Sequence, residues 1–534
     1  MKNKLIYLFL FLISLLSVWR LFRVGYPSMQ DDMQIFHLEQ FDQCLKDGQI
    51  PCRYIAQGGL GYGYPLYNFY SPLPYAIAEA FHLIGFSFIN SIKISFILPA
   101  FVRTFGMYFL ATAFFGSGGG LLSAILFAFA PYQALNTFVR GAVAETWALS
   151  LLPFIFWSLY KRHNKLSILF LSALFLSHNL TLLYALPLLL IFSIFTKNTK
   201  FFIRSSLWSF CAAAFFLLPA FFEKNLTTVN TMTQGYFSYF IHFATLKELF
   251  ISNYWGYAGS MWGPIDGLSF SIGLFQWLIP SLVFIYYLSH KNLKHHFLII
   301  LLYIIGVFAL FLTHSRSTFI WKLLPFMAYF QFPWRFLAPA IFCFSLISGG
   351  LVQIISPKFK NPILIFLGLT IILLNLPYFQ EDIWYPNLTD AQKLSPAEIS
   401  NQSGDGLMDY WPKYSQNFPT SFAPSTPTIV SGQVSVDNFS KNSHQANLNL
   451  LVITSNATIN LPIVYFPNWE LKIDNQKSSY QIEPNLGLIQ ITLPQGEHQI
   501  LLNFVNTPLR NAANCLSLLT FASFIILIIR EKRS

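Results

Sequence analysis

Two adjacent carboxylic acids follow the first apolar run of the chain. The run extends from Leu5 to Phe22, and Asp31 and Asp32 come a few residues later. A carboxylate at a membrane surface is partly desolvated, which raises its pKa toward the range of a general base. The same pair is also typical of a helix N-terminus, where acids cap the first turn. From the pair alone, a catalytic base and a helix cap both stay open.

Two arginines are candidates for holding a phosphate. Arg140 lies between two apolar runs, and Arg335 lies at the start of another. Guanidinium groups bind phosphate through paired hydrogen bonds. Glu145 inside a run and His178 at the end of one are candidate neighbours, because ionisable groups in spans are costly. The alternatives are an ion pair that closes the loop, a structural histidine, and an arginine that extends to lipid headgroups.

A segment rich in tyrosine and glycine extends from Gly58 to Tyr75. Tyrosine rings stack on sugar faces, and their hydroxyls pair with sugar hydroxyls. The segment therefore predicts a sugar-binding surface, and the alternative is an aromatic belt at the membrane interface. The candidate substrate-binding residues are Arg53, Tyr62, Tyr64, Tyr67, Tyr70 and Tyr410.

The chain that must position these residues is strongly apolar. Of its 534 residues, 54% are hydrophobic and only 10% are charged, whereas a soluble domain carries about 25% charged residues. This composition excludes a soluble enzyme and predicts a mainly α-helical, polytopic membrane bundle. Runs of roughly 20 apolar residues give about twelve spans, among them 90–113, 118–135, 143–160 and 297–313. The segment 72–88 is either a further span or an amphipathic surface helix.

The distribution of charge decides the orientation of the spans. The net charge is +11, from 33 Lys and Arg against 22 Asp and Glu. If 72–88 lies on the surface, with Glu79 and His82 on its wet side, most basic clusters fall on the same side as Lys2. Basic loops stay cytoplasmic, so both termini are predicted to be cytoplasmic and the candidate site residues to lie on the outer side. Topology explains the basic residues, and no nucleic-acid partner is predicted.

The predicted domains follow from these runs. A transmembrane domain covers 1–378 and includes a first outer loop with interfacial helices over 24–89. An irregular outer segment covers 379–426. Short alternating segments separated by turns predict an outer β-sandwich over 427–508, and a final transmembrane helix covers 511–530.

Cysteine and glycine patterns exclude several other chemistries. Five cysteines are too few for a disulfide scaffold. Cys44 and Cys52 lie together in the first outer loop and can form a bridge if that loop faces an oxidising compartment. The sequence contains no Cys/His metal spacing, no P-loop and no G-x-S-x-G, so it predicts neither a metal site nor a cytoplasmic nucleotide site.

Several motifs together resemble known membrane proteins. They are GYGYPLYNFYSPLPY, FVRGAVAETWALSLLPF, SHNL, QFPWRF and the late Asp409-Tyr410-Trp411-Pro412. These motifs resemble the bacterial membrane proteins catalogued as 6-pyruvoyl-tetrahydropterin synthase-related, a name that does not imply pterin chemistry here. An acid after the first span, a long outer loop and a multi-span bundle resemble the GT-C superfamily of integral-membrane glycosyltransferases.

The resemblance implies a glycosyltransferase of the bacterial cell envelope. Such an enzyme transfers a sugar from a polyprenyl-phosphate carrier to a glycan, lipid or protein acceptor at the outer face of the plasma membrane. The role of base then falls on Asp31 or Asp32, and the donor phosphate on Arg140 and Arg335. Some members use a divalent cation, which this sequence does not decide.

Two other functions remain open. A transporter or flippase suits twelve spans, although the chain lacks the paired repeats that many transporters carry. A non-catalytic membrane scaffold, whose β-sandwich binds a glycan or a protein, is the second alternative.

Overall fold

The computed structural model describes residues 2–261, 267–404 and 409–531, so part of the predicted irregular segment, 405–408, lies outside it. The chain is mainly helical, with 59% of its residues in helices. It folds into two compact units, and each unit is assembled from three separate stretches of sequence. The first unit consists of Met1–Gln34, Ile89–Ser209 and Met232–Leu388, and the second of Ile35–Phe88, Phe210–Thr231 and Thr389–Ser534.

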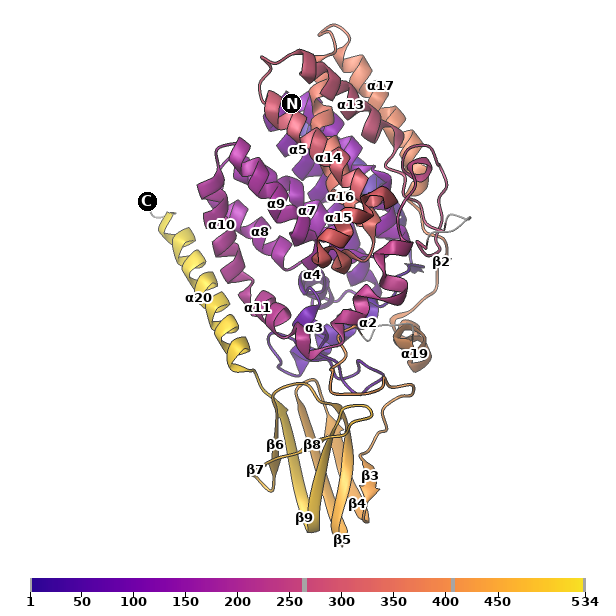
Figure 1. Ribbon diagram of the computed structural model, residues 1–534, viewed down its shortest axis with the longest axis vertical. Coiled ribbons are helices and arrows are strands. Elements are labelled where there is room, and N and C mark those ends of the chain that lie inside the picture. The colour runs from indigo at the N-terminus through magenta and orange to yellow at the C-terminus, as the bar shows by residue number, and fades with distance from the viewer. Residues whose placement is uncertain (1, 262–266, 405–408, 532–534) are drawn as a thin grey trace. The chain divides into compact units, whose positions relative to one another are not determined.

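The first unit is a bundle of apolar helices (Figure 1). Its longer helices are α1 (Lys2–Leu16), α5 (Phe88–Ala128), α7 (Val143–Tyr160), α8 (Asn164–Phe175), α9 (Asn179–Phe195), α10 (Thr199–Ala212), α13 (Leu274–Ser289), α14 (His296–Thr313), α16 (Leu337–Ser348) and α17 (Lys360–Asn375). Short helices connect them, including α12 (Leu246–Phe250) and α15 (Thr318–Leu323).

The apolar helices define a membrane protein. Six described helices are long and apolar enough to cross a bilayer, and there are seven if α10 and α11 (Ala214–Phe222) count as one span. Four shorter apolar helices accompany them: Lys4–Leu16, Asn164–Phe175, Asn179–Phe195 and Leu274–Ser289. The count of about twelve spans therefore stays a prediction.

The predicted runs 90–113 and 118–135 correspond to two helical parts of α5. The 41 residues of α5 are divided by a kink at Gly116, where φ is 75° and ψ is 177°. Only glycine adopts that conformation readily. The next turn packs closely, because a Cβ atom on Gly119 would lie 2.5 Å from the backbone oxygen of Gly349. The glycine run thus breaks α5 and admits a neighbouring backbone.

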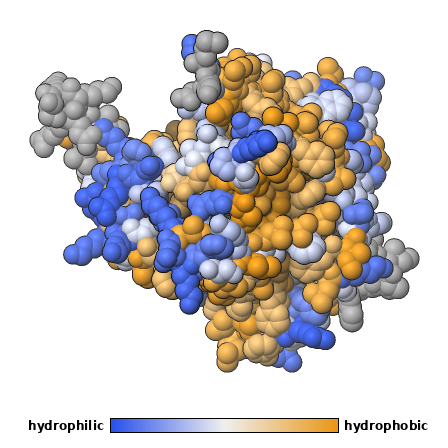
Figure 2. Space-filling model, turned by 90° about the horizontal axis from the view of Figure 1, so that it is seen from above, coloured by the Kyte–Doolittle hydropathy of each residue, from blue (hydrophilic) through white to orange (hydrophobic). Residues whose placement is uncertain are grey.

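Apolar side chains cover much of the outer surface of the helices. They dominate the face shown in Figure 2, where hydrophobic residues are orange. On α17 the exposed side chains include Ile365, Phe366, Leu369 and Leu373, which are 57–70% exposed. Such a surface is stable only in an apolar solvent such as the bilayer core.

The second unit contains the antiparallel sheet and the final helix. The strands are β3 (Thr428–Ser431), β4 (Val434–Lys441), β5 (Gln445–Val464), β6 (Trp469–Ile473), β7 (Gln476–Ser478), β8 (Gln481–Ile482) and β9 (Leu488–Phe504). They form one seven-stranded sheet of order β3-β5-β9-β6-β7, in which β4 also pairs with β5 and β8 with β9. Helix α20 (Pro508–Glu531) follows directly.

The sheet differs from the predicted sandwich of short strands. Two of the expected short strands, 445–454 and 457–466, lie largely within the single strand β5, whose pairing with β9 has only an irregularity between Val452 and Asn456. Buried side chains alternate along the first half of β5, at Ala446, Leu448, Leu450 and Val452. One long strand therefore carries the apolar face that two strands were expected to share.

The first outer loop folds together with this sheet. Within the second unit, the Tyr54 hydroxyl donates to the Val464 carbonyl at 3.0 Å, and the Val464 N–H donates to the Tyr62 carbonyl at 2.8 Å. Cys44 and Cys52 are joined by a disulfide. The loop helices are α2 (Gln34–Lys46), α3 (Leu66–Phe69) and α4 (Leu73–His82), and α18 (Asp390–Lys393) and α19 (Pro396–Gly404) lie in the segment that was expected to be irregular.

Helix α4 corrects one expectation about the 72–88 segment. Glu79 was expected on the wet side of this helix, but it is only 2% exposed. It faces α2, where the charges of Asp42 and Lys46 act on it. Burial, then the Asp42 charge, raises the pKa of Glu79 to about 7, although His82 and Lys46 lower it. The packing of α2 against α4, which no local pattern encodes, explains the difference.

Glu79 should make the stability of the protein depend on pH. Its pKa is higher in the folded state than the ordinary 4.5, so the folded state binds the proton more tightly. The stabilisation is fully present below about pH 4.5 and is lost as the pH rises toward 7, by about 1–3 kcal/mol. Melting temperatures at pH 5 and pH 8 should fall more for the wild type than for Glu79→Gln. Exposed Glu497→Gln is the matched control, and equal shifts in all three proteins would contradict the prediction.

Candidate functional site

Backbone pairing fixes the segment that carries Asp31. Strand β1 (Tyr26–Pro27) pairs with β2 (Trp384–Tyr385). A few residues later, the Gln30 N–H donates to the Val139 carbonyl at 2.9 Å, and the Asp31 N–H donates to the Arg140 carbonyl at 2.8 Å. These bonds use only the main chain, so they place the Asp31 side chain beside the Arg140 loop without constraining its carboxylate.

Arg140 follows a break in the helical chain. The predicted span 118–135 ends at Ala128, because Pro131 lacks an N–H and Ala130 before it is extended (φ −64°, ψ 133°). The chain continues as the short helix α6 (Pro131–Ala134) and the π-helix η2 (Leu135–Val139). π-Helical turns are rare and occur frequently at functional sites.

Glu145 is the centre of a buried ionic cluster. Near the start of α7 and 2% exposed, it accepts a hydrogen bond from Arg140 Nη1 at 2.8 Å through Oε2. The Nε atom of Arg335 lies 3.6 Å from the same oxygen. The Tyr132 hydroxyl donates to Oε1. One carboxylate therefore holds two guanidinium groups side by side.

Aromatic rings and amides complete the surroundings of the arginines. The Arg140 guanidinium lies 4.5 Å from the centre of the Trp334 ring, and its Nη1 donates to Asn136 Oδ1 at 2.5 Å. Arg335 Nη1 donates to the Phe330 carbonyl at 2.8 Å. Since the described hydrogen bonds of Arg140 use Nη1, its Nε and Nη2 groups are left to bind an anion.

Electrostatics connects Asp31 to this cluster. Desolvation by the surrounding protein raises the pKa of Asp31, the Arg140 and Arg335 charges lower it, and Glu145 raises it further, with a net rise. Asp31 still has an exposed surface, which a substrate hydroxyl requires. Burial lowers the pKa of Arg140, but Glu145, Tyr132 and Asp31 together raise it above its ordinary value. Arg140 therefore stays charged beside a carboxylate with enhanced basicity.

His178 lies near the same cluster, between α8 and α9. Its Nδ1 atom is 2.8 Å from the Thr181 hydroxyl oxygen, to which the Tyr184 hydroxyl donates at 3.4 Å. The Glu145 charge acts on both His178 and Tyr184. The first unit thus brings together Asp31 and the four ionisable residues that were predicted from its span ends.

Asp31 and Asp32 have different electrostatic surroundings. The charges that act on Asp31 are those of Arg140, Arg335 and Glu145. The charge of Asp32 acts on Tyr26, whose pKa is raised well above its ordinary value, first by burial and then by Asp32. Asp31 is therefore coupled to the arginines, and Asp32 is coupled to Tyr26.

Gly141 keeps the Asp31 segment against the Arg140 loop. Its φ is 68°, and a Cβ atom there would lie 2.4 Å from Met29 Sδ. We expect Gly141→Ala to lower the free energy of unfolding by about 1–2 kcal/mol, because alanine disfavours this conformation and meets Met29. Thermal unfolding in detergent tests this. Adding Met29→Ala should relieve the contact but not the backbone strain; full recovery, or wild-type stability of Gly141→Ala alone, would contradict the prediction.

The predicted sugar-binding tyrosines lie in the second unit. Tyr62, Tyr64 and Tyr67 are buried, and Tyr70 and Tyr410 are partly exposed. The rings pack on other aromatic rings, as in the stacking of Tyr410 on Phe69 at 5.3 Å. The rings of Tyr62, Tyr64 and Tyr67 therefore lie in the interior of this unit, and their role toward a sugar stays a prediction.

Arg53 is also buried in the second unit. It donates to Asn68 Oδ1 at 3.2 Å, to the Phe215 carbonyl at 3.0 Å and to Asn514 Oδ1 at 2.8 Å. These bonds connect three parts of the chain that are distant in sequence. The geometry of Arg53 is therefore that of a structural residue, and its role toward substrate stays a prediction.

Three residues of the site were not predicted: Tyr132 holds Glu145, and Asn136 and Trp334 contact Arg140. A signal was present, since polar residues recur at Tyr132, Gln133 and Asn136 within an apolar stretch. Because 118–135 was predicted to be one membrane span, the polar residues near its end were attributed to the end of a helix and not to a site.

The residues of the site do not form a metal centre. Within the described part of the chain, no three His, Cys, Asp or Glu side chains lie together as a metal ion would require. The donor set around Glu145 is mostly cationic, which does not fit a divalent cation. We therefore derive no step through such a cation.

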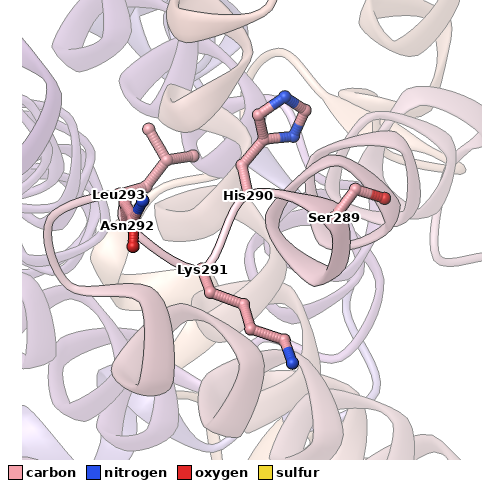
Figure 3. A pocket seen from close by; sticks show the side chains of 5 residues that line it. All are labelled: Ser289, His290, Lys291, Asn292 and Leu293. Carbon is pink, nitrogen blue, oxygen red and sulfur yellow. The ribbon is translucent and has the colours of Figure 1, made fainter.

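One surface hollow lies elsewhere in the fold. It is lined by Ser289, His290, Lys291, Asn292 and Leu293, in the turn between α13 and α14. Figure 3 shows the His290 and Lys291 side chains pointing in different directions. This hollow has none of the convergent polar groups of a ligand site, and we place the candidate site at the Glu145 cluster.

Comparisons with known proteins give few matches. No family model matches the chain. An uncharacterized protein from Lactococcus lactis subsp. cremoris (strain MG1363) is 26% identical over 306 residues, which cover 52% of this chain and 47% of that protein. The chain thus spans about half the length of the curated relative that it matches. The narrower resemblance to the 6-pyruvoyl-tetrahydropterin synthase-related proteins stays a prediction.

Among solved structures, the cryo-EM structure of the arabinofuranosyltransferase AftD from Mycobacteria is similar to part of the chain. The likeness covers 69% of this chain and 26% of that chain, with 13% sequence identity and a TM-score of 0.41. At that TM-score the likeness supports no conclusion about function, and the proposals below depend on the residues alone.

Proposed function

We propose that the protein is a GT-C-type integral-membrane glycosyltransferase. It moves a sugar from a polyprenyl-phosphate carrier to an acceptor at the outer face of the plasma membrane, with both termini in the cytoplasm. The observation that carries the proposal is the charge coupling of Asp31 to two arginines that share one buried carboxylate. A base beside paired guanidinium groups is what transfer from a phosphate requires.

The residues suit a transfer of the sugar from the carrier phosphate to the acceptor hydroxyl in a single step. The acceptor hydroxyl gives its proton to the Asp31 carboxylate as its oxygen forms a bond to the anomeric carbon of the sugar. The bond between that carbon and the phosphate oxygen breaks, and the electron pair leaves with the polyprenyl phosphate. Arg140 and Arg335 stabilise the charge that develops on this leaving group.

Glu145 has a positioning role in this scheme. Two guanidinium groups close together repel each other, and the shared carboxylate offsets that repulsion. Because Tyr132 also holds Glu145, the arginines need little reorganisation when the phosphate arrives. The polyprenyl tail stays in the bilayer, next to the apolar surfaces of the helices.

The test is cleavage of a lipid-linked sugar by the purified protein. Vesicles containing the full chain and polyprenyl-phosphate-linked glucose, mannose or galactose, labelled in the sugar, are mixed with a bacterial cell-envelope extract as the source of acceptor. We expect bare polyprenyl phosphate to form as label enters the acceptor. Vesicles with the Arg140→Gln variant serve as the control.

Two results would overturn the proposal. The first is protein-dependent movement of the intact carrier between leaflets without cleavage, which is flippase activity. The second is accumulation of free label inside the vesicles, which is transport. Absence of cleavage with all three donors also counts against it.

A further inference from the structure

Buried polar atoms without a partner gather beside Arg140. Among the described residues, Nε2 and Oε1 of Gln133, Nδ2 of Asn136 and Nε1 of Trp334 are buried and make no hydrogen bond. The three residues are 0%, 0% and 2% exposed. A buried polar group that has lost water without gaining a partner destabilises the fold, so such groups call for an explanation.

Contacts and helical spacing place these residues beside Arg140. Asn136 Oδ1 already accepts a hydrogen bond from Arg140, which leaves only its amide N–H groups. The Trp334 ring lies against the Arg140 guanidinium. Gln133 precedes Asn136 by three residues in the helical segment formed by α6 and η2, a spacing that puts the two side chains on the same face. All three residues therefore belong to the break that presents Arg140, or contact it.

The unpartnered atoms include both donors and an acceptor. Two amide groups and an indole N–H donate, and Gln133 Oε1 accepts. A phosphate at neutral pH offers almost only acceptors, so it would leave Gln133 Oε1 unpaired. Sugar hydroxyls both donate and accept. The Trp334 ring already stacks on Phe332 at 5.0 Å and on Arg140, so its N–H edge, rather than its face, is left for a ligand.

We propose that Gln133, Asn136 and Trp334 form the subsite that holds the hydroxyls of the donor sugar. The inference rests on the proposed function, because a sugar joined to a phosphate on Arg140 and Arg335 must lie beside those arginines. The phosphate binds to the guanidinium groups, and the three side chains form hydrogen bonds with the sugar hydroxyls. The subsite thus contributes to the choice of sugar, whereas the arginines bind any lipid phosphate.

Binding to bare and sugar-linked carriers tests the subsite. The full chain in detergent micelles is titrated with polyprenyl phosphate and with its glucose, mannose, galactose and N-acetylglucosamine derivatives. The variants are Gln133→Met, which removes the amide at a similar side-chain volume, and Trp334→Phe, which removes the indole N–H, is smaller, and keeps an aromatic ring at this position. Asn136 is left intact because its Oδ1 positions Arg140. Trp277→Phe is the matched control, since its indole N–H is also buried without a partner and no contact with Arg140 is described for it.

We expect the wild type to bind at least one sugar-linked carrier about tenfold or more tightly than bare polyprenyl phosphate. Gln133→Met and Trp334→Phe should lose most of that preference and keep their affinity for the bare carrier. Trp277→Phe should behave like the wild type. Without ligand, the melting temperature of Gln133→Met should equal or exceed that of the wild type, because an unpaired buried amide is replaced by an apolar group.

Separate outcomes overturn the two proposals. If the wild type binds bare and sugar-linked carriers equally, or if Gln133→Met lowers the melting temperature and keeps the preference, the sugar subsite is wrong while the phosphate site stands. If no carrier binds, or if Arg140→Gln leaves the affinity for bare polyprenyl phosphate unchanged, the proposed function fails and the subsite fails with it.

Discussion

Replacing Asp31 by asparagine is expected to slow sugar transfer by about 10²–10⁴-fold, the usual contribution of a general base. The amide cannot take the proton of the acceptor hydroxyl, and it removes a negative charge that acts on both arginines. The fold should be retained, because the hydrogen bond from residue 31 to the Arg140 carbonyl uses the backbone N–H. The measurement is the rate of polyprenyl phosphate release from the labelled donor, with the melting temperature as a check on folding.

Asp32→Asn is the matched control for this prediction. It changes the adjacent residue in the same chemical way, and the charge of that residue acts on Tyr26. We expect it to retain most of the activity. If Asp32→Asn loses activity and Asp31→Asn does not, the assignment of the base is reversed. Full activity of the double variant would exclude both acids as the base.

Replacing Glu145 by methionine is expected to lower the free energy of unfolding by about 3–5 kcal/mol. The change removes the partner of Arg140 at 2.8 Å and of Arg335 at 3.6 Å, and it leaves two buried positive charges close together. It also removes the acceptor of the Tyr132 hydroxyl. Titration with SDS in mixed micelles measures the effect, and sugar transfer should be lost because the arginines are no longer held.

The double variant Arg140→Met/Glu145→Met separates stability from catalysis. Removing both members of a buried ion pair is less destabilising than removing one. In the double variant only Arg335 is left without its carboxylate, and the repulsion between two adjacent cations is gone. We expect it to recover part of the stability that Glu145→Met loses, while activity stays absent. A double variant that is less stable than Glu145→Met, or that transfers sugar, would contradict this account of the cluster.

The candidate site was partly predictable because charged residues are rare in apolar runs. Arg140, Glu145 and Arg335 stood out for that reason, and the distribution of basic loops placed them at the same ends of the spans as Asp31. The choice between Asp31 and Asp32 was not predictable. The backbone hydrogen bonds to the Arg140 loop give the side chains of Asp31 and Asp32 different surroundings. Those bonds join residues more than a hundred positions apart, so the sequence around the two acids does not reveal them.

The helices were predictable where the apolar runs are long and continuous. They were less predictable where contacts between helices determine which face is buried. The apolar runs at 143–160 and 297–313 correspond closely to α7 and α14. The helix around Glu79 was correctly placed, but its buried face depends on α2. The tyrosines at 62, 64 and 67 were expected to bind sugars, whereas their rings lie inside the second unit. A tyrosine-rich segment has the same composition whether it lines a sugar site or packs in the interior. Only the tertiary contacts distinguish the two roles.

The three-part construction of the second unit has a consequence for biosynthesis. Residues 35–88 need strand β5 and its neighbours to complete their hydrogen bonds, as with Tyr54, Tyr62 and Val464, yet those strands are made several hundred residues later. At a synthesis rate of about 5–20 residues per second, the early segment waits on the order of 20–90 s for its partners. During that time its apolar tyrosine-rich surface has no native cover. We therefore expect cells to protect this segment with a chaperone, and C-terminally truncated chains to be degraded rather than to accumulate as a working membrane domain.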